Sequence, residues 1–80
     1  MIEKTITLNN YNSIKKFVEI TKTKPYDIEL MYKNKTVNAK DINAIFSLDL
    51  TKPLVLVAHC DSAGELLMQI KKNIYEGKTF

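Results

Sequence analysis

Few side chains in this sequence have the chemistry that a catalytic or metal site requires. His59 and Cys60 are adjacent, and each is the only residue of its type. Adjacent side chains in a strand point to opposite faces of the sheet, so these two residues are not expected to bind one ion. Because no further histidine or cysteine is present to complete a ligand set, we predict no metal site and no cofactor.

The carboxylates Asp27 and Glu29 are the other candidates for chemistry. Their spacing places both on one face of a strand, where they would form either a general acid–base pair or a solvated edge. Alternation with Ile28 and Leu30 puts that face toward solvent, which favours the solvated edge. The sequence also has only two glycines, which excludes a glycine-rich phosphate loop or a dinucleotide-binding fingerprint. We therefore predict a protein that is not an enzyme.

The charge of the chain argues against nucleic acid as a partner. The net charge is +3, and all 12 basic residues are lysines. Arginine supplies the bidentate contacts of sequence-specific readers, whereas lysine acts as a point charge. The lysines are also scattered and lack the interleaved aromatic residues on which bases stack. We predict no nucleic-acid partner.

The same sequence predicts a cytoplasmic protein without a membrane partner. The longest apolar run, residues 54–58, is far shorter than the roughly 20 residues that span a bilayer. The N-terminus lacks the apolar core and small-residue cleavage site of a signal peptide. The single cysteine is not able to form an internal disulfide, which agrees with a reducing compartment.

Hydrophobic periodicity predicts secondary structure in the order βαββαβα. Residue alternation indicates strands at 3–8, 26–32, 36–39 and 54–59, the last of them apolar on both faces and therefore central and covered on both sides. Helical spacing predicts three helices: one capped by Asn12 or Ser13 and ending before Pro25, a short one capped by Asp41 and ending before Pro53, and one opened by the SAGE capping box and closed by Gly77. This order predicts a single α+β domain, residues 1–80, in which a four-stranded antiparallel sheet carries three helices on one face.

The central segment KTVNAKDINAIFSLDL, the opening EKTITL and the order of elements resemble those of HPr. HPr is the small histidine phosphocarrier of the bacterial sugar phosphotransferase system. The family has Y-N-G-K-x-V-N followed by K-S-I-M-G-x-x-S-L, and the corresponding residues here are 32–38 and 40–48. The resemblance covers nearly the whole chain and implies an open-faced β-sandwich.

The resemblance also implies that the phosphoacceptor has been lost. In HPr a histidine in a G-x-H-A-R-P segment opens the first helix, where helix amides and the arginine stabilise the phosphoryl group. The corresponding segment here is residues 13–18, and the phosphoacceptor position is Lys15. His59, in or just after the fourth predicted strand, is an alternative phosphoacceptor.

In many relatives a serine opening the short helix is phosphorylated, and the apolar residues after it dock enzyme I, sugar permease domains or a transcriptional regulator. Here that position is Asp41, which either only caps the helix or mimics a phosphoserine. We expect Ile45 and Leu48 to face the sheet, and Ile42 and Phe46 to project from it.

We therefore predict a regulatory, non-catalytic HPr-like protein that binds a protein partner. The predicted partner-binding residues are Lys40, Asp41, Ile42, Asn43 and Phe46. The resemblance implies phosphotransferase-system components or a regulator of carbon metabolism as partners. Two alternatives stay open: a phosphocarrier that uses His59, and a structural or oligomerising module that reuses the fold.

Overall fold

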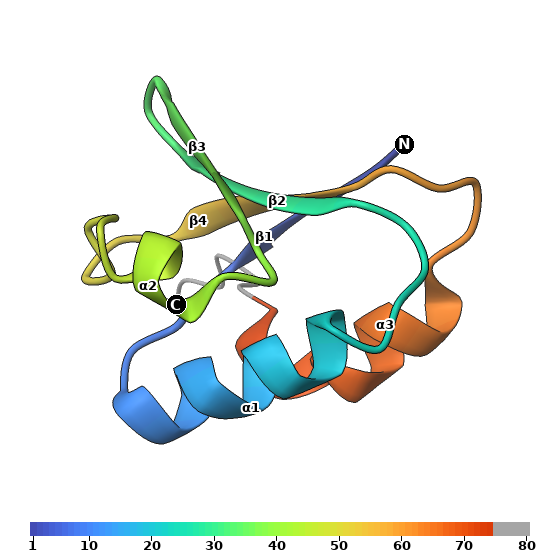
Figure 1. Cartoon of the computed structure of the whole chain (residues 1–80), viewed down its shortest axis with the longest axis horizontal. Helices are drawn as coiled ribbons and strands as arrows, with labels where there is room; N and C mark the ends of the chain where they lie inside the picture. The colour runs from blue at the N-terminus through green and yellow to red at the C-terminus, as the bar shows by residue number, and fades with distance from the viewer. Residues whose placement is uncertain (75–80) are drawn as a thin grey trace, which may run out of the picture.

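A twisted antiparallel sheet with helices packed on one face forms the framework of the protein in a computed structural model, which describes residues 1–74 (Figure 1). The sheet contains β1 (Ile2–Ile6), β2 (Ile28–Tyr32), β3 (Lys35–Asn38) and β4 (Leu54–Ala58). The helices are α1 (Tyr11–Thr21), α2 (Ile42–Ile45) and α3 (Gly64–Gln69), followed by the 3₁₀ turn η1 (Lys71–Asn73). The predicted order βαββαβα is confirmed. Within residues 1–74 no helix is long and apolar enough to cross a membrane.

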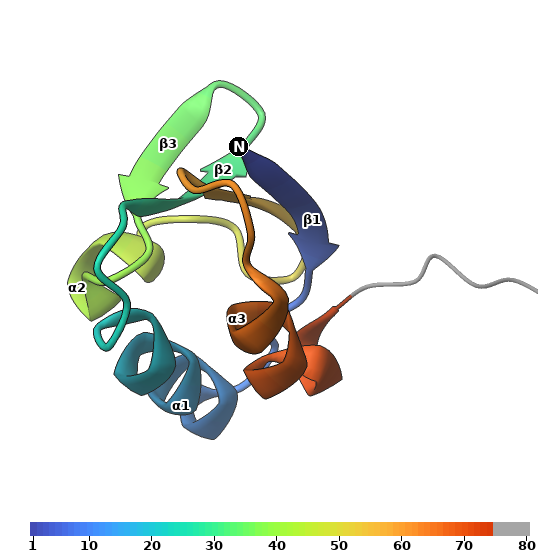
Figure 2. The same ribbon diagram turned by 90° about the vertical axis from the view of Figure 1, so that its right-hand side faces the viewer.

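The strand order is β1-β4-β2-β3, and all neighbours are antiparallel. β4 is central, as predicted. The prediction that both of its faces are covered is wrong, because Val55 is 36% exposed on the open face. All three helices lie on the other side of the sheet (Figure 2). Val57 is buried on the open face because it pairs with Glu3 on one side and Glu29 on the other.

The core lies between the sheet and the helices. Ile6, Leu30 and Leu56 point inward from three strands, and Phe17 of α1 and Leu66 of α3 meet them; all five are fully buried. Burying a large apolar side chain stabilises a fold by about 1.5–3 kcal/mol, so this layer holds the helices in place.

The first helix begins earlier than the predicted caps, Asn12 or Ser13. Asn10 is the N-cap, and its side-chain oxygen accepts a hydrogen bond from the backbone N–H of Ser13 at 2.8 Å. Asn10 is as good a cap as the predicted residues. Its use sets the helix start at Tyr11 while keeping Ile14 and Phe17 in the core.

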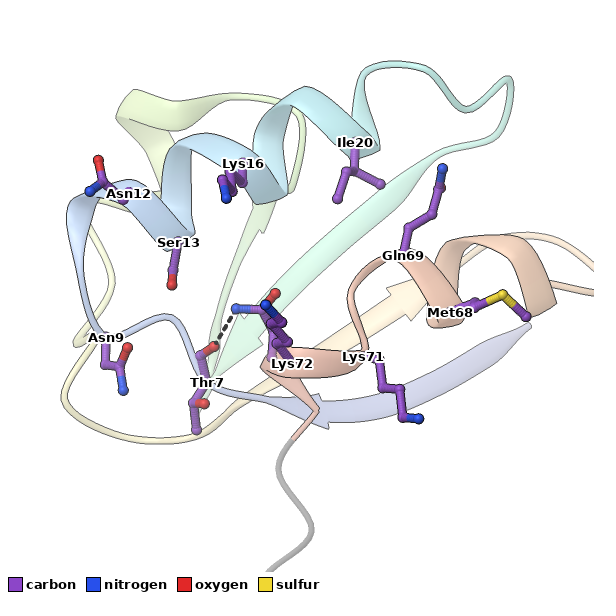
Figure 3. Close-up of a pocket in the computed structure, with 11 residues that line it drawn as sticks. Thr7, Asn9, Asn12, Ser13, Lys16, Ile20, Met68, Gln69, Lys71 and Lys72 are labelled. Atoms are coloured by element: carbon purple, nitrogen blue, oxygen red, sulfur yellow. Dashed lines mark hydrogen bonds between the residues drawn. The ribbon is translucent and has the colours of Figure 1, made fainter.

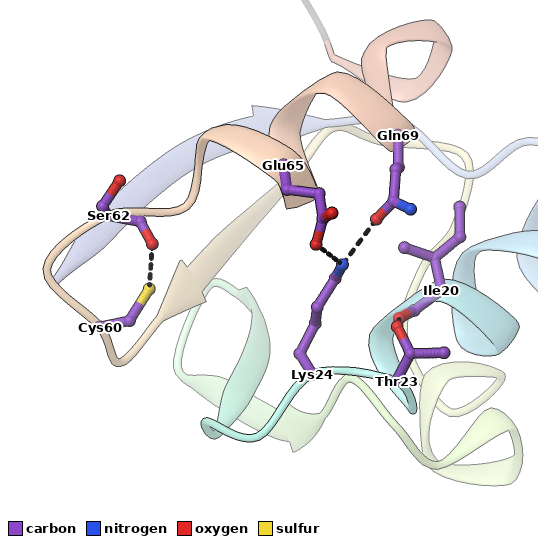
Figure 4. Close-up of polar contacts among 7 residues, drawn as sticks. All are labelled: Ile20, Thr23, Lys24, Cys60, Ser62, Glu65 and Gln69. Carbon is purple, nitrogen blue, oxygen red and sulfur yellow. Dashed lines mark hydrogen bonds and ion pairs between the residues drawn. The ribbon is translucent and has the colours of Figure 1, made fainter.

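The predicted capping box of the third helix is absent. The N-cap is Ala63, which has no side-chain cap bond, and the carboxylate of Glu65 instead binds the ammonium of the buried Lys24 at 3.0 Å (Figure 4). Gln69 accepts a second hydrogen bond from that ammonium at 2.7 Å. A buried ammonium requires such partners, so the Glu65 carboxylate, although it lies in the first turn of α3, pairs with Lys24 and does not close a capping box.

The third helix is also shorter than predicted. It ends at Gln69, and Ile74, which lies within the predicted helix, forms a β-bridge with Ile6 instead. The predicted end at Gly77 lies outside the described residues.

Candidate functional site

The short helix α2 is held at its start by Asp41. The Asp41 carboxylate accepts hydrogen bonds from the backbone N–H groups of Asn43 at 3.0 Å and Ala44 at 3.2 Å. These bonds satisfy two of the donors that a helix N-terminus leaves open, which confirms the predicted cap. The backbone of a four-residue helix is marginal by itself, so the cap and the core contacts of the helix together fix its position.

The apolar residues in and after α2 divide between the core and solvent. Ile45 and Leu48 are buried, as expected. Ile42 was expected to project from the sheet, but it is partly buried against the core, as is Leu50. Phe46 is 45% exposed. The segment therefore hides most of its apolar surface and leaves one large aromatic side chain in solvent.

Phe46 stacks on Tyr11, the first residue of α1. The ring centroids are 6.1 Å apart and the ring planes differ by 9°. Tyr11 is 59% exposed, so the pair forms a two-ring apolar patch at the junction of α1 and α2. Helical periodicity does not predict Tyr11 as a site residue, because Tyr11 lies outside the apolar stripe of α1. Its only sequence signal is an aromatic residue directly after the cap.

Other predicted binding residues lie around this pair. Asn43 is exposed, whereas the ammonium of Lys40 is directed inward and donates a hydrogen bond to the carbonyl of Lys24 at 2.8 Å. After α2, hydrogen bonds from the hydroxyl and backbone N–H of Thr51 lower the pKa of the exposed Asp49. Asp41 and Asp49 thus give this segment two carboxylates, although the net charge of the whole chain is +3.

The start of α1 contains no imidazole. Its opening residues are Asn10, Tyr11, Asn12 and Ser13, and the exposed Lys15 lies in the second turn. Helix α1 therefore begins at Tyr11, two residues before residues 13–18, which correspond to the family's phosphoacceptor segment.

His59 lies at the other end of the sheet. The residue pairing brings Ala58, at the end of β4, beside Ile2 at the start of β1, whereas α1 follows the end of β1 (Figure 1). The His59 ring nitrogen Nε2 is 2.8 Å from a carboxylate oxygen of Glu29. The Glu29 side chain is 41% exposed, in keeping with the predicted solvated edge, but it also pairs with His59, which directly follows the adjacent strand β4. No group of three metal-ligating side chains occurs within residues 1–74.

Comparison with solved structures shows what this architecture resembles. HPr-C-His from Thermoanaerobacter tengcongensis superposes with a TM-score of 0.75 and 28% identity, over 90% of this chain and 89% of that chain. The chain has the HPr fold. The phosphocarrier HPr from Bacillus anthracis gives a TM-score of 0.70 at 24% identity, over 92% and 96% of the two chains.

The histidine-containing phosphocarrier protein of Mycoplasma shows the same HPr architecture at lower identity. Its TM-score is 0.67 at 14% identity, over 89% of this chain and 86% of that chain. No protein-family model matches the sequence, and a search of curated proteins also gives no match. The predicted fold class, an HPr-like open-faced sandwich with helices on one face, is confirmed.

Proposed function

We propose that this chain is an HPr-like protein of the phosphoenolpyruvate-dependent sugar phosphotransferase system that works by binding a protein partner and carries no phosphoryl group. The docking surface consists of Tyr11, Asp41, Ile42, Asn43 and Phe46. The expected partners are phosphotransferase-system components or a regulator of carbon metabolism in the cytoplasm, as the likeness to HPr implies. In this proposal Lys40 does not contact the partner, because its ammonium is directed inward and donates to the carbonyl of Lys24.

The Tyr11–Phe46 pair is the observation that carries this proposal. Ile45 and Phe46 are adjacent, yet Ile45 is fully buried and Phe46 is 45% exposed. Phe46 is therefore not part of the hydrophobic core. Aromatic residues are enriched among those that dominate binding energy, and covering an exposed apolar patch is favourable at about 25 cal/mol per Å². The absence of histidine from the opening of α1 supports a binding role over phosphoryl transfer.

Phe46→Ser is expected to abolish partner binding while the protein remains folded. The substitution removes one of the two rings of the patch, and the lost ring stack should cost about 0.5–1.5 kcal/mol of stability. Binding is measured by titrating purified enzyme I, sugar permease domains and carbon regulators in turn, and stability by thermal melting.

Met68→Ser is the matched control, because Met68 is 76% exposed on a different helix. It should bind the partner as the wild type does. Equal loss of binding in both variants, or normal binding by Phe46→Ser, would refute the docking surface. A concentration-dependent mass of the isolated chain, with no binding to any of these proteins, would favour the oligomerising module instead.

Asp41→Asn separates the cap from the charge. The amide oxygen of asparagine still accepts the bonds from Asn43 and Ala44, so stability should change by less than about 0.5 kcal/mol, whereas Asp41→Ala should cost about 1 kcal/mol. If the carboxylate contacts the partner as a phosphoserine mimic, Asp41→Asn weakens binding at unchanged stability. If Asp41 only caps α2, Asp41→Asn binds normally in the same titration.

A further inference from the structure

A groove separate from the docking surface lies between the start of α1 and the end of α3. It has a volume of about 610 Å³ and is open to solvent. Volumes of about 300–1,000 Å³ are typical of small-molecule sites. Its walls come from the loop before α1, one face of α1, and the α3–η1 turn (Figure 3).

The groove is positively charged. Lys16, Lys71 and Lys72 line it, and none of the described lining residues is acidic. The ion pairs among residues 1–74 join Lys24 to Glu65 and His59 to Glu29, so none of the three lysines is neutralised by a described carboxylate. Among the described residues, three lysines around one hollow with no acidic residue in its lining create a positive potential that favours an anionic ligand.

Neutral donors and an apolar surface accompany these charges. The Ser13 hydroxyl points from α1 toward the wall that carries Thr7, and Lys16 and Lys72 lie on opposite walls of the groove (Figure 3). The side chains of Asn9 and Asn12 also line this end of the groove, and Ile20 and Met68 line the other. A phosphate monoester has oxygens enough for two ammonium groups and a hydroxyl at once, and asparagine side chains suit the hydroxyl groups of a polyol.

Hydrogen bonds between the end of β1 and the η1 turn fix the two walls of the groove relative to each other. The backbone N–H of Thr7 donates to the carbonyl of Asn73 at 2.7 Å, and the Asn73 side-chain amide donates back to the carbonyl of Thr7 at 3.2 Å. The Ile6–Ile74 bridge continues this pairing. Lys72 therefore sits on a turn that is tied to the end of β1, so the groove is formed before a ligand arrives.

We propose that this groove binds a small phosphorylated polyol, with Lys16, Lys72 and the Ser13 hydroxyl on the phosphate. Lys71 lies at the rim and adds long-range attraction. The proposal is independent of the docking surface on α2, since the two share no residue.

The probe is ribose 5-phosphate, compared with ribose and inorganic phosphate, in a titration followed by the amide NMR signals of the full chain. We expect saturable binding of ribose 5-phosphate with a Kd below about 1 mM, weaker binding of phosphate alone, and none of ribose. The signals that shift should include Ser13, Lys16 and Asn73. Absence of saturation by ribose 5-phosphate, equal binding of inorganic phosphate, or shifts confined to other regions would overturn the proposal.

The double variant Lys16→Gln/Lys72→Gln should weaken binding of ribose 5-phosphate about tenfold or more. The matched control is Lys4→Gln/Lys52→Gln, which removes the same charge at exposed sites outside the groove and should change affinity by no more than about twofold. Equal losses in both variants would mean general attraction to a basic protein and would overturn the assignment. Phe46→Ser should bind the probe normally, which separates this test from that of the docking surface.

Discussion

Ile45→Ala is expected to destabilise the protein by about 2–5 kcal/mol, the range for truncating a buried aliphatic side chain to alanine. Ile45 is fully buried between α2 and the sheet, so alanine leaves a cavity that a short helix fixed by its cap is poorly able to close. Domains of this kind are stable by about 5–15 kcal/mol in total, so the variant would lose much of its stability. Denaturant unfolding measures the effect as a lower midpoint.

The neighbouring variant Phe46→Ser provides the comparison. Both residues lie in the same short segment, but their exposed fractions are 0% and 45%. We expect the midpoint of Phe46→Ser to fall much less than that of Ile45→Ala. Similar losses in the two variants would contradict the division of α2 between a core face and a docking face.

Incubation with phosphoenolpyruvate and enzyme I is expected to leave no acid-labile phosphoryl group on this protein. The opening turn of α1 has asparagine, tyrosine and serine side chains but no imidazole, and lysine lacks the ring nitrogen that accepts the phosphoryl group in the phosphocarriers. Lys15→His should not restore transfer, because residue 15 lies in the second turn of α1 and the chain has no arginine to stabilise the added charge. An HPr with its histidine serves as the positive control, and radiolabelled phosphoenolpyruvate provides the measurement.

His59 is the residue that would reverse this expectation. Its ring is 40% exposed and pairs with Glu29, which leaves it accessible to solvent. If the wild type acquires an acid-labile phosphoryl group and His59→Ala does not, the chain is a phosphocarrier that uses His59. Rapid phosphorylation of Lys15→His alone would contradict the argument from the position of Lys15.

Local sequence patterns determined the order of elements and the architecture of this protein. Strand alternation, helical spacing and the prolines after α1 and α2 depend on neighbouring residues, and the structure reproduces the order of the elements and the central place of β4. The Asp41 cap and the inward direction of Ile45 and Leu48 follow from the same short-range geometry. The cap and the inward-facing residues could be predicted because each depends on residues only a few positions apart in the sequence.

Only the tertiary structure decided which residues meet across the fold. Several residues before α1 are equally good caps, and packing of the helix on the core selected Asn10. Glu65, expected in a capping box, pairs with the buried ammonium of Lys24, which comes from a distant part of the sequence. Tyr11 reached Phe46, and Glu29 reached His59, because α1 lies against α2 and β2 lies beside β4. The docking patch and the basic groove both form between segments distant in the sequence, and hydrophobic periodicity carries no information about such pairs because it records only which face of an element is buried.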